Sequence, residues 1–159
     1  MARRPGFSFY VVMALAVALD QATKAWATAA LKPVESVVVV PGLLNLTYNL
    51  NTGVAFGMFA GQGLIVVLLV IALAVAVICN IQDLNWAGWE PNLVGGCLCG
   101  GALGNLADRL RSGYVVDFID AHAGAHHWPI FNMADSLICV SVGWILVRQF
   151  WGKKRGTTA

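Results

Sequence analysis

The sequence predicts an all-α membrane protein with four transmembrane helices and a small extracytoplasmic β-ribbon cradle between spans one and two. Hydrophobic residues make up 58% of the 159 residues and charged residues only 11%. Soluble domains carry about 25% charged residues, so the composition favours a membrane protein. Four long apolar segments alternate with polar loops. The chain length suits one domain, so residues 1–159 are expected to form a single membrane domain.

The predicted helices cover about residues 7–30, 62–80, 93–110 and 135–151. Their strictly apolar parts are shorter than the ~20 residues that cross a bilayer. Polar flanking residues extend each part as a helix, because polar groups at one end of a span can face headgroups or a water-filled site.

The first apolar segment also has features of a cleavable signal peptide. Arg3-Arg4 precede it, and Ala25-Trp26-Ala27 follow it in the pattern of a cleavage site. Asp20 and Lys24 interrupt that pattern, and their spacing of four residues places them on one helix face, where they can pair. Three further apolar segments follow, so we expect the first to be retained as a span.

Positive charges near the chain ends predict the orientation. Arg3-Arg4 precede the first span, and Lys153-Lys154-Arg155 follow the last. Cytoplasmic flanks are enriched in lysine and arginine, so both termini are expected to be cytoplasmic. The loops at 31–61 and 111–134 then lie outside. The inner loop at 80–92 carries no lysine or arginine to support this orientation.

The first outer loop has the pattern of two short strands. Mostly β-branched and leucine residues at 37–40 and 43–48 flank the turn-forming pair Pro41-Gly42. We expect a ribbon over about residues 34–48, a break at 49–53, and an interfacial segment at 55–59.

The third span carries glycines four residues apart, at Gly96, Gly100 and Gly104. Small residues at this spacing let helix backbones approach closely. We expect them to pack within the chain rather than to form a dimer.

Two aspartates adjoin long apolar segments. Asp117 lies between Val116 and Phe118, and Asp135 opens the last span. A carboxylate near hydrocarbon is costly and is usually retained for function. If the two converge, they can share one proton and activate a water molecule. Asp135 could instead serve only as the N-cap of its helix.

Other polar residues near the outer side have simpler explanations. Asp20 is expected to pair with Lys24. Asp108 is expected to join a local structural network beside Arg109, and Asp120 to be solvated. Three amides can orient carboxylates or bind a peptide backbone, or can be turn and cap residues: Asn51, Asn105 and Asn132.

The sequence indicates neither nucleic-acid binding nor a cofactor. The net charge of +2 comes without a basic stripe and interleaved aromatic residues. The cysteines lie in apolar stretches and are expected to be small buried residues: Cys79, Cys97, Cys99 and Cys139. The histidines lie in a later loop, at no familiar metal-ligand spacing from Cys97-x-Cys99: His122, His126 and His127.

Five blocks, in this order, resemble motifs of the signal peptidase II family: Asp20–Lys24, Asn51–Phe56, Gly104–Arg109, Val115–Phe118 and Phe131–Ser136. The resemblance implies an aspartic endopeptidase of the bacterial inner membrane, with its active site toward the extracytoplasmic face. Its implied substrates are diacylglyceryl-modified prolipoproteins, cleaved on the amino side of the lipidated cysteine. The resemblance also implies sensitivity to the lipopeptide globomycin.

By the same resemblance, Asp117 and Asp135 form the catalytic pair. One carboxylate would remove a proton from water while the other protonates or hydrogen-bonds the scissile carbonyl. The residues expected to position the substrate or the pair are Asn51, Asn105, Arg109 and Asn132. The residues expected to give structural support are Asp20, Lys24 and Asp108.

Three other classes of protein would share some of these features. A small proton-coupled carrier would also place acids within spans, but internal repeats are typical of carriers and none is visible. A membrane adaptor would explain the glycines but not the paired aspartates. A metalloprotease would need a motif such as His-Glu-x-x-His, which the sequence lacks.

Overall fold

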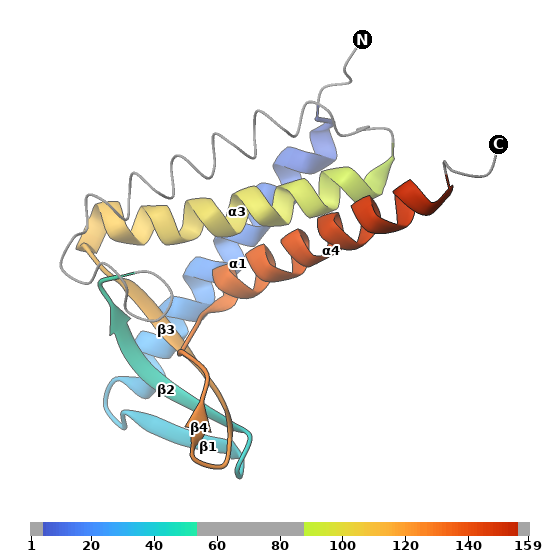
Figure 1. Ribbon diagram of the computed structural model, residues 1–159. Helices are drawn as coiled ribbons and strands as arrows, with labels where there is room; N and C mark the ends of the chain where they lie inside the picture. The colour runs from blue at the N-terminus through green and yellow to red at the C-terminus, as the bar shows by residue number, and fades with distance from the viewer. Residues whose placement is uncertain (1–4, 54–87, 156–159) are drawn as a thin grey trace.

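The computed structural model describes residues 5–53 and 88–155. Within them the chain forms three helices and a four-stranded sheet (Figure 1). The helices are α1 (Phe7–Leu31), α3 (Trp89–Ser112) and α4 (Met133–Arg155). The second predicted span, at about 62–80, and the segment at 55–59 lie outside the described residues.

The sheet is larger than the predicted ribbon. Its strands are β1 (Ser36–Val40), β2 (Leu44–Asn51), β3 (Val115–Ala123) and β4 (His126–His127), in that spatial order and all antiparallel. The expected break at 49–53 is wrong, because β2 continues to Asn51 and pairs there with β3. The segment at 111–134 was expected to be only a loop. A two-stranded ribbon alone is marginally stable, and β3 gives it a third strand. The description of the fold as all-α with a small ribbon is therefore incomplete, because the sheet has four strands.

A glycine ends α3 and turns the chain into β3. Gly113 has φ +79°, and its backbone N–H donates to the carbonyl of Arg109 at 3.0 Å. Glycine adopts this left-handed conformation without strain. Tyr114, Val115 and Val116 follow, and aromatic and β-branched residues favour a strand.

Glycines of α3 form its contacts with the other helices. A Cβ atom on Gly100 would lie 2.5 Å from the Cβ of Ala16 in α1, and one on Gly101 would lie 2.7 Å from the carbonyl oxygen of Ala134 in α4. Cβ atoms on Gly96 and Gly104 would likewise lie too close to side chains of α1. The predicted packing role of these glycines within the chain is confirmed.

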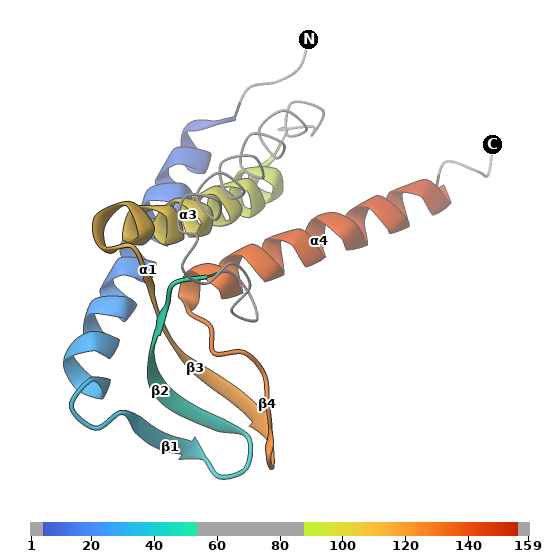
Figure 2. The same cartoon turned by 60° about the vertical axis from the view of Figure 1, so that its left-hand side comes forward.

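The sheet lies beyond the start of α4 and beside the last turns of α1, whereas α1 begins and α4 ends far from it (Figures 1 and 2). Buried Ala27 and Leu31 of α1 pack with Phe118 of β3. Partly buried side chains of β2 and β3 complete this cluster: Leu46, Tyr48, Val116 and Ile119. The junction between sheet and helices is therefore held by an apolar core next to Asp117.

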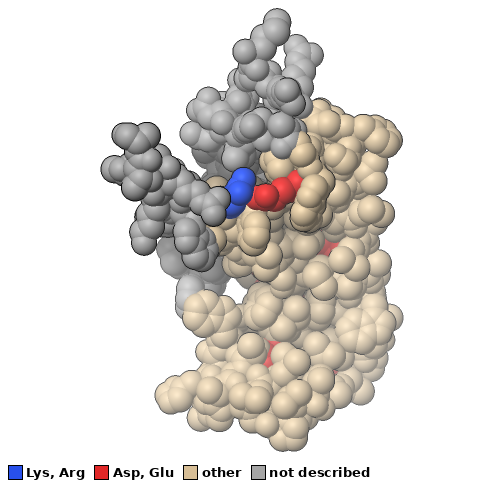
Figure 3. Space-filling view, turned by 90° about the vertical axis from the view of Figure 1, so that its right-hand side faces the viewer, with Lys and Arg blue, Asp and Glu red and all other residues tan. Residues whose placement is uncertain are grey.

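The described surface carries many apolar side chains. Figure 3 shows one face that is mostly uncharged. Among residues 5–53 and 88–155, no helix combines the length and the hydropathy expected of a membrane-spanning helix.

Cys139 is exposed and Cys97 and Cys99 are half-buried, so the expected burial of the cysteines is wrong for these three. Neighbouring Val140 is exposed too, because this stretch of α4 faces outward. Cys79 lies outside the described residues.

Candidate active site

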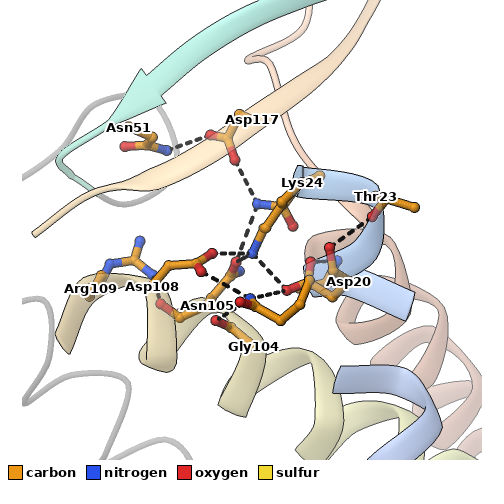
Figure 4. A network of polar contacts seen from close by, with 12 residues as sticks. Asp20, Thr23, Lys24, Asn51, Gly104, Asn105, Asp108, Arg109 and Asp117 are labelled. Carbon is orange, nitrogen blue, oxygen red and sulfur yellow. Dashed lines mark hydrogen bonds and ion pairs between the residues drawn. The ribbon is translucent and has the colours of Figure 1, made fainter. Parts of the chain in front are cut away.

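The polar site lies where the sheet meets the helices, and it draws on every helix described. Asp117 lies on β3, and Asp135 lies in the first turn of α4. Side chains from α1 and α3 approach the same place (Figure 4). The structure thus brings the two predicted aspartates into one hydrogen-bonded network, which the following contacts define.

Asp117 is buried and accepts two amide hydrogen bonds. Its exposed fraction is 1%. One carboxylate oxygen accepts from the side-chain amide of Asn51 at 2.9 Å, and the other from that of Asn132 at 2.6 Å. Asn51 ends β2, and Asn132 immediately precedes α4. Both carboxylate oxygens are therefore fixed by residues from outside β3.

Asp135 is held by a reciprocal cap at the start of α4. The side-chain oxygen of Asn132 accepts a hydrogen bond from the backbone N–H of Asp135, and Oδ2 of Asp135 accepts one from the backbone N–H of Asn132. This is the capping-box arrangement, with Asn132 as the N-cap. Oδ1 of Asp135 accepts from the amide of Asn105 at 2.7 Å. The N-cap explanation of Asp135 is therefore wrong, because the cap residue is Asn132.

A cluster of charges lies behind these amides, between α1 and α3 (Figure 4). Nζ of Lys24 lies 2.8 Å from Oδ2 of Asp20 and 2.6 Å from Oδ2 of Asp108. The predicted pairing of Asp20 with Lys24 is confirmed. Asp108 also accepts from Gln21 at 2.9 Å, so the network of Asp108 extends to α1 rather than staying beside Arg109. Gln21 was not singled out from the sequence, although its place next to Asp20 could have indicated it.

Arg109 ties the loop after β2 to α3. Its guanidinium donates to the carbonyl of Gly53 at 2.8 Å and to the carbonyl of Asn105 at 3.2 Å. These contacts keep the guanidinium close to the site, where a positive charge can interact with a polar substrate.

Burial controls the protonation of Asp117. The pKa of Asp117 is raised to about 6. Burial and the negative charge of Asp135 raise this pKa, whereas the hydrogen bonds from Asn51 and Asn132 and the charge of Lys24 lower it. Two nearby carboxylates titrate as a pair. The arrangement can therefore hold one proton near the pH at which most enzymes work.

Asp120 is not solvated, contrary to expectation. It is buried, and its carboxylate lies 2.7 Å from Nδ1 of His127, which stacks on His122. Asn45 and Thr47 of β2 reach the other carboxylate oxygen of Asp120 at 3.4 Å each. The burial follows from the continuation of β3 through Asp120, which the loop-like composition concealed. Asp120 belongs to the far end of the sheet and not to the network of Asp117.

Metal chemistry has no candidate ligand set in the part of the chain that the structure describes. No group of three or more histidine, cysteine or acidic side chains there could hold an ion.

Comparison with known proteins gives consistent matches. Residues 12–151 match the family described as Signal peptidase (SPase) II. The chain is 43% identical to the Lipoprotein signal peptidase of Syntrophotalea carbinolica over 88% of this chain and 89% of that protein. It is 38% identical to the Lipoprotein signal peptidase of Oleidesulfovibrio alaskensis, over 91% of this chain and 95% of that protein.

Two solved structures have a similar fold, and both are described as bacterial membrane enzymes determined by the in meso method. One superposes with a TM-score of 0.83 at 29% identity, and covers 100% of this chain and 98% of its own. The other superposes with a TM-score of 0.78 at 31% identity, and covers 94% of this chain and 97% of its own.

Proposed function

The chain belongs to the signal peptidase II family, and we propose that Asp117 and Asp135 are the two carboxylates with which it cleaves its substrates. Members of this family are membrane aspartic proteases, and the chain is an enzyme that removes signal peptides from prolipoproteins. It is an integral protein of the bacterial inner membrane. The carrier alternative finds no support among the relatives.

One observation carries the catalytic assignment. Asn132 donates to Asp117 and caps the helix that begins with Asp135, so one buried amide links both carboxylates. The negative charge of Asp135 also raises the pKa of Asp117, so the two carboxylates are close enough for their titrations to be coupled.

The proposed reaction uses the two aspartates in different protonation states. Asp135 lies at the N-terminus of α4, where the helix dipole favours a negative charge, and is proposed to take the proton from water. Asp117, with its pKa near 6, is proposed to hold the shared proton and donate it toward the scissile carbonyl oxygen. The water then attacks the peptide bond on the amino side of the lipidated cysteine.

Asn51, Asn105, Arg109 and Asn132 are proposed to position the substrate or the pair. Asn51, Asn105 and Asn132 donate to the aspartates, and Arg109 lies at the loop that follows β2. The ribbon formed by β1 and β2 is proposed to cradle the substrate at the membrane surface, because valines along β1 and Leu43 are exposed.

The lipid of the substrate is proposed to remain in the bilayer during cleavage. Burial of acyl chains stabilises by about 0.8 kcal/mol per CH₂, so extraction of a diacylglyceryl group would be prohibitive. We further propose that four helices span the membrane, with both termini cytoplasmic and the aspartates toward the outer face. In this orientation the cleavage point meets water at the boundary.

The test is cleavage of a synthetic diacylated lipobox peptide by purified protein. Wild type is expected to cleave before the lipidated cysteine. Asp117→Asn and Asp135→Asn are each expected to lose about 10²- to 10⁴-fold in turnover, because an amide cannot exchange the proton. Asp120→Asn is the matched control, since it removes a buried carboxylate from the same strand, and it should retain activity. Near-normal turnover by either active-site variant would refute the assignment.

A further inference from the structure

We propose that Lys24 is a positioning residue for the aspartate pair, because it fixes the side-chain amide of Asn105 with the NH₂ group directed toward Asp135. This inference rests on the function proposed above and assigns Lys24 a role beyond structural support. It concerns a residue on α1 that contacts neither catalytic aspartate through a hydrogen bond of its own.

The ammonium group of Lys24 is buried among three polar partners. Lys24 is 4% exposed. Its three partners are Asp20 at 2.8 Å, Asp108 at 2.6 Å and the side-chain oxygen of Asn105 at 2.8 Å. The ammonium group donates hydrogen bonds to Asp20 and Asn105, and its contact with Asp108 is an ion pair. Two of these partners are carboxylates that balance its charge, and the third is the amide that leads to the active site.

The amide of Asn105 has only one orientation compatible with these neighbours. Its oxygen accepts from Lys24, and its nitrogen donates to Asp135 at 2.7 Å. A flipped amide would direct its NH₂ group at an ammonium and its oxygen at a carboxylate. Both contacts would then be repulsive, and neither partner could adapt, because lysine cannot accept and an ionised carboxylate cannot donate.

The same orientation extends to Asn132. The oxygen of Asn105 also lies 3.2 Å from the side-chain nitrogen of Asn132, and that nitrogen donates to Asp117 at 2.6 Å. The contacts therefore run from Lys24 through Asn105 and Asn132 to Asp117, and Figure 4 shows Lys24, Asn105 and Asp117 along this path. One buried cation therefore orients two amides, and each amide presents a donor to one of the two aspartates.

Oriented donors matter because they hold each carboxylate at a fixed angle. Misplacement of a reacting group by about 1 Å can cost 10²-fold in rate. The positive charge of Lys24 also acts at longer range, because it lowers the pKa of Asp117 against the effect of burial. Loss of Lys24 should therefore impair the chemical step and also allow the pair to keep its proton to higher pH.

The experiment compares Lys24→Met with Asp108→Asn in the diacylated-peptide assay. Asp108→Asn removes one partner of Lys24 but leaves the contact with Asn105, so it is the control for weakened packing of the charge cluster. Lys24→Met is expected to lower kcat about 10- to 100-fold with KM changed less than about 3-fold. Its kcat/KM should also decline at a higher pH than in wild type. Asp108→Asn should keep kcat within about 3-fold of wild type, with no such shift to higher pH.

Lys24→Met leaves buried Asp20 and half-buried Asp108 without their cation, which can unfold the variant. The double variant Asp108→Asn/Lys24→Met removes part of this charge imbalance and differs from Asp108→Asn only at residue 24. The same loss of kcat and the same shift of the pH profile are expected in that comparison. The inference would be overturned by near-normal kcat in the variants that lack Lys24. It would also be overturned if Lys24→Met and Asp108→Asn lost kcat equally and in proportion to their loss of thermal stability.

Cleavage by the two aspartate variants tests the proposed function separately from the role of Lys24. If Asp117→Asn and Asp135→Asn abolish cleavage while loss of Lys24 does not, only the positioning role of Lys24 fails. If those two variants remain active, the catalytic assignment itself fails.

Discussion

Asn132 and Asp135 exchange two hydrogen bonds across the start of α4, at 3.1 Å from the backbone nitrogen of Asp135 and at 3.2 Å from that of Asn132. The same side chain of Asn132 donates to Asp117. Asn132 therefore caps a helix and also belongs to the proposed active site, and the two roles can be separated by substitution.

Asn132→Asp is expected to keep the helix cap but to lose cleavage. Aspartate is as good an N-cap as asparagine, so its oxygen can still accept from the backbone of Asp135. Its second oxygen would face Asp117 and the oxygen of Asn105, where a donor is needed. Asn132→Ala should lose activity and also about 1 kcal/mol of stability. Thermal unfolding and peptide cleavage, measured on both variants, distinguish the two roles; an active Asn132→Asp enzyme would contradict this account.

The protonation of Asp117 predicts how stability depends on pH. Its pKa is raised to about 6 in the folded protein, against about 3.9 for an unperturbed aspartate. The folded state then binds a proton that the unfolded state has lost, so this residue makes folding less favourable as pH rises from about 4 to 6. The difference over that window is about 3 kcal/mol.

Asp117→Asn removes this dependence. The unfolding free energy of wild type, relative to that of the variant, should therefore fall between pH 4 and 6 and be flat on either side. Denaturation curves in detergent across that pH range provide the measurement. Parallel curves for the two proteins would mean that the pKa of Asp117 is not raised.

Close packing of α3 on α1 predicts opposite effects of two glycine substitutions. Gly100→Ala would place a Cβ atom 2.5 Å from Ala16 and 2.7 Å from the backbone oxygen of Met13, so it should cost about 1–3 kcal/mol. Gly143→Ala is the control, because no described atom lies within 4 Å of its Cβ position in α4. Alanine there should be neutral or stabilise by up to about 1 kcal/mol. Thermal unfolding of both variants checks this, and equal melting temperatures would count against tight packing at Gly100.

Chelation should leave cleavage unchanged. Two carboxylates are sufficient to activate water, and the described part of the chain holds no cluster of metal ligands. The measurement is peptide turnover after exhaustive dialysis against EDTA. Loss of activity that zinc restores would move the enzyme to the metalloprotease class.

Globomycin is expected to inhibit through the aspartate pair. A hydroxyl group between Asp117 and Asp135 would resemble the tetrahedral intermediate, and mimics of transition states bind about 10²- to 10⁸-fold more tightly than substrates. Affinity should therefore fall in Asp117→Ala and in Asp135→Ala. Titration of the inhibitor against wild type and both variants tests this, and equal affinity in all three would place the inhibitor elsewhere.

Local patterns in the sequence were sufficient for features that depend on neighbours along the chain. The four-residue spacing of Asp20 and Lys24 predicted their ion pair, and the four-residue spacing of Gly96, Gly100 and Gly104 predicted a close-packed helix face. Both depend only on helix geometry, which an apolar segment of sufficient length makes predictable.

Features that depend on contacts between residues far apart in the sequence were not predicted. The pairing of Asn49 with Asp117 joins two loops that the sequence presents separately, so neither the length of β2 nor the existence of β3 was predicted. The burial of Asp120 follows from that same strand. The contact of Lys24 with Asn105 likewise joins α1 to α3, and no local spacing encodes the direction of a side-chain amide.

Asp117 reaches the site only when β3 has paired with β2 and packed on the end of α1. Asp135, by contrast, needs only the first turn of α4. We therefore expect a molecule whose helices have assembled without the sheet to be inactive, because one residue of the proposed catalytic pair lies on the sheet. During refolding, recovery of peptide cleavage should lag behind recovery of helical circular dichroism, and its rate should report the docking of the sheet.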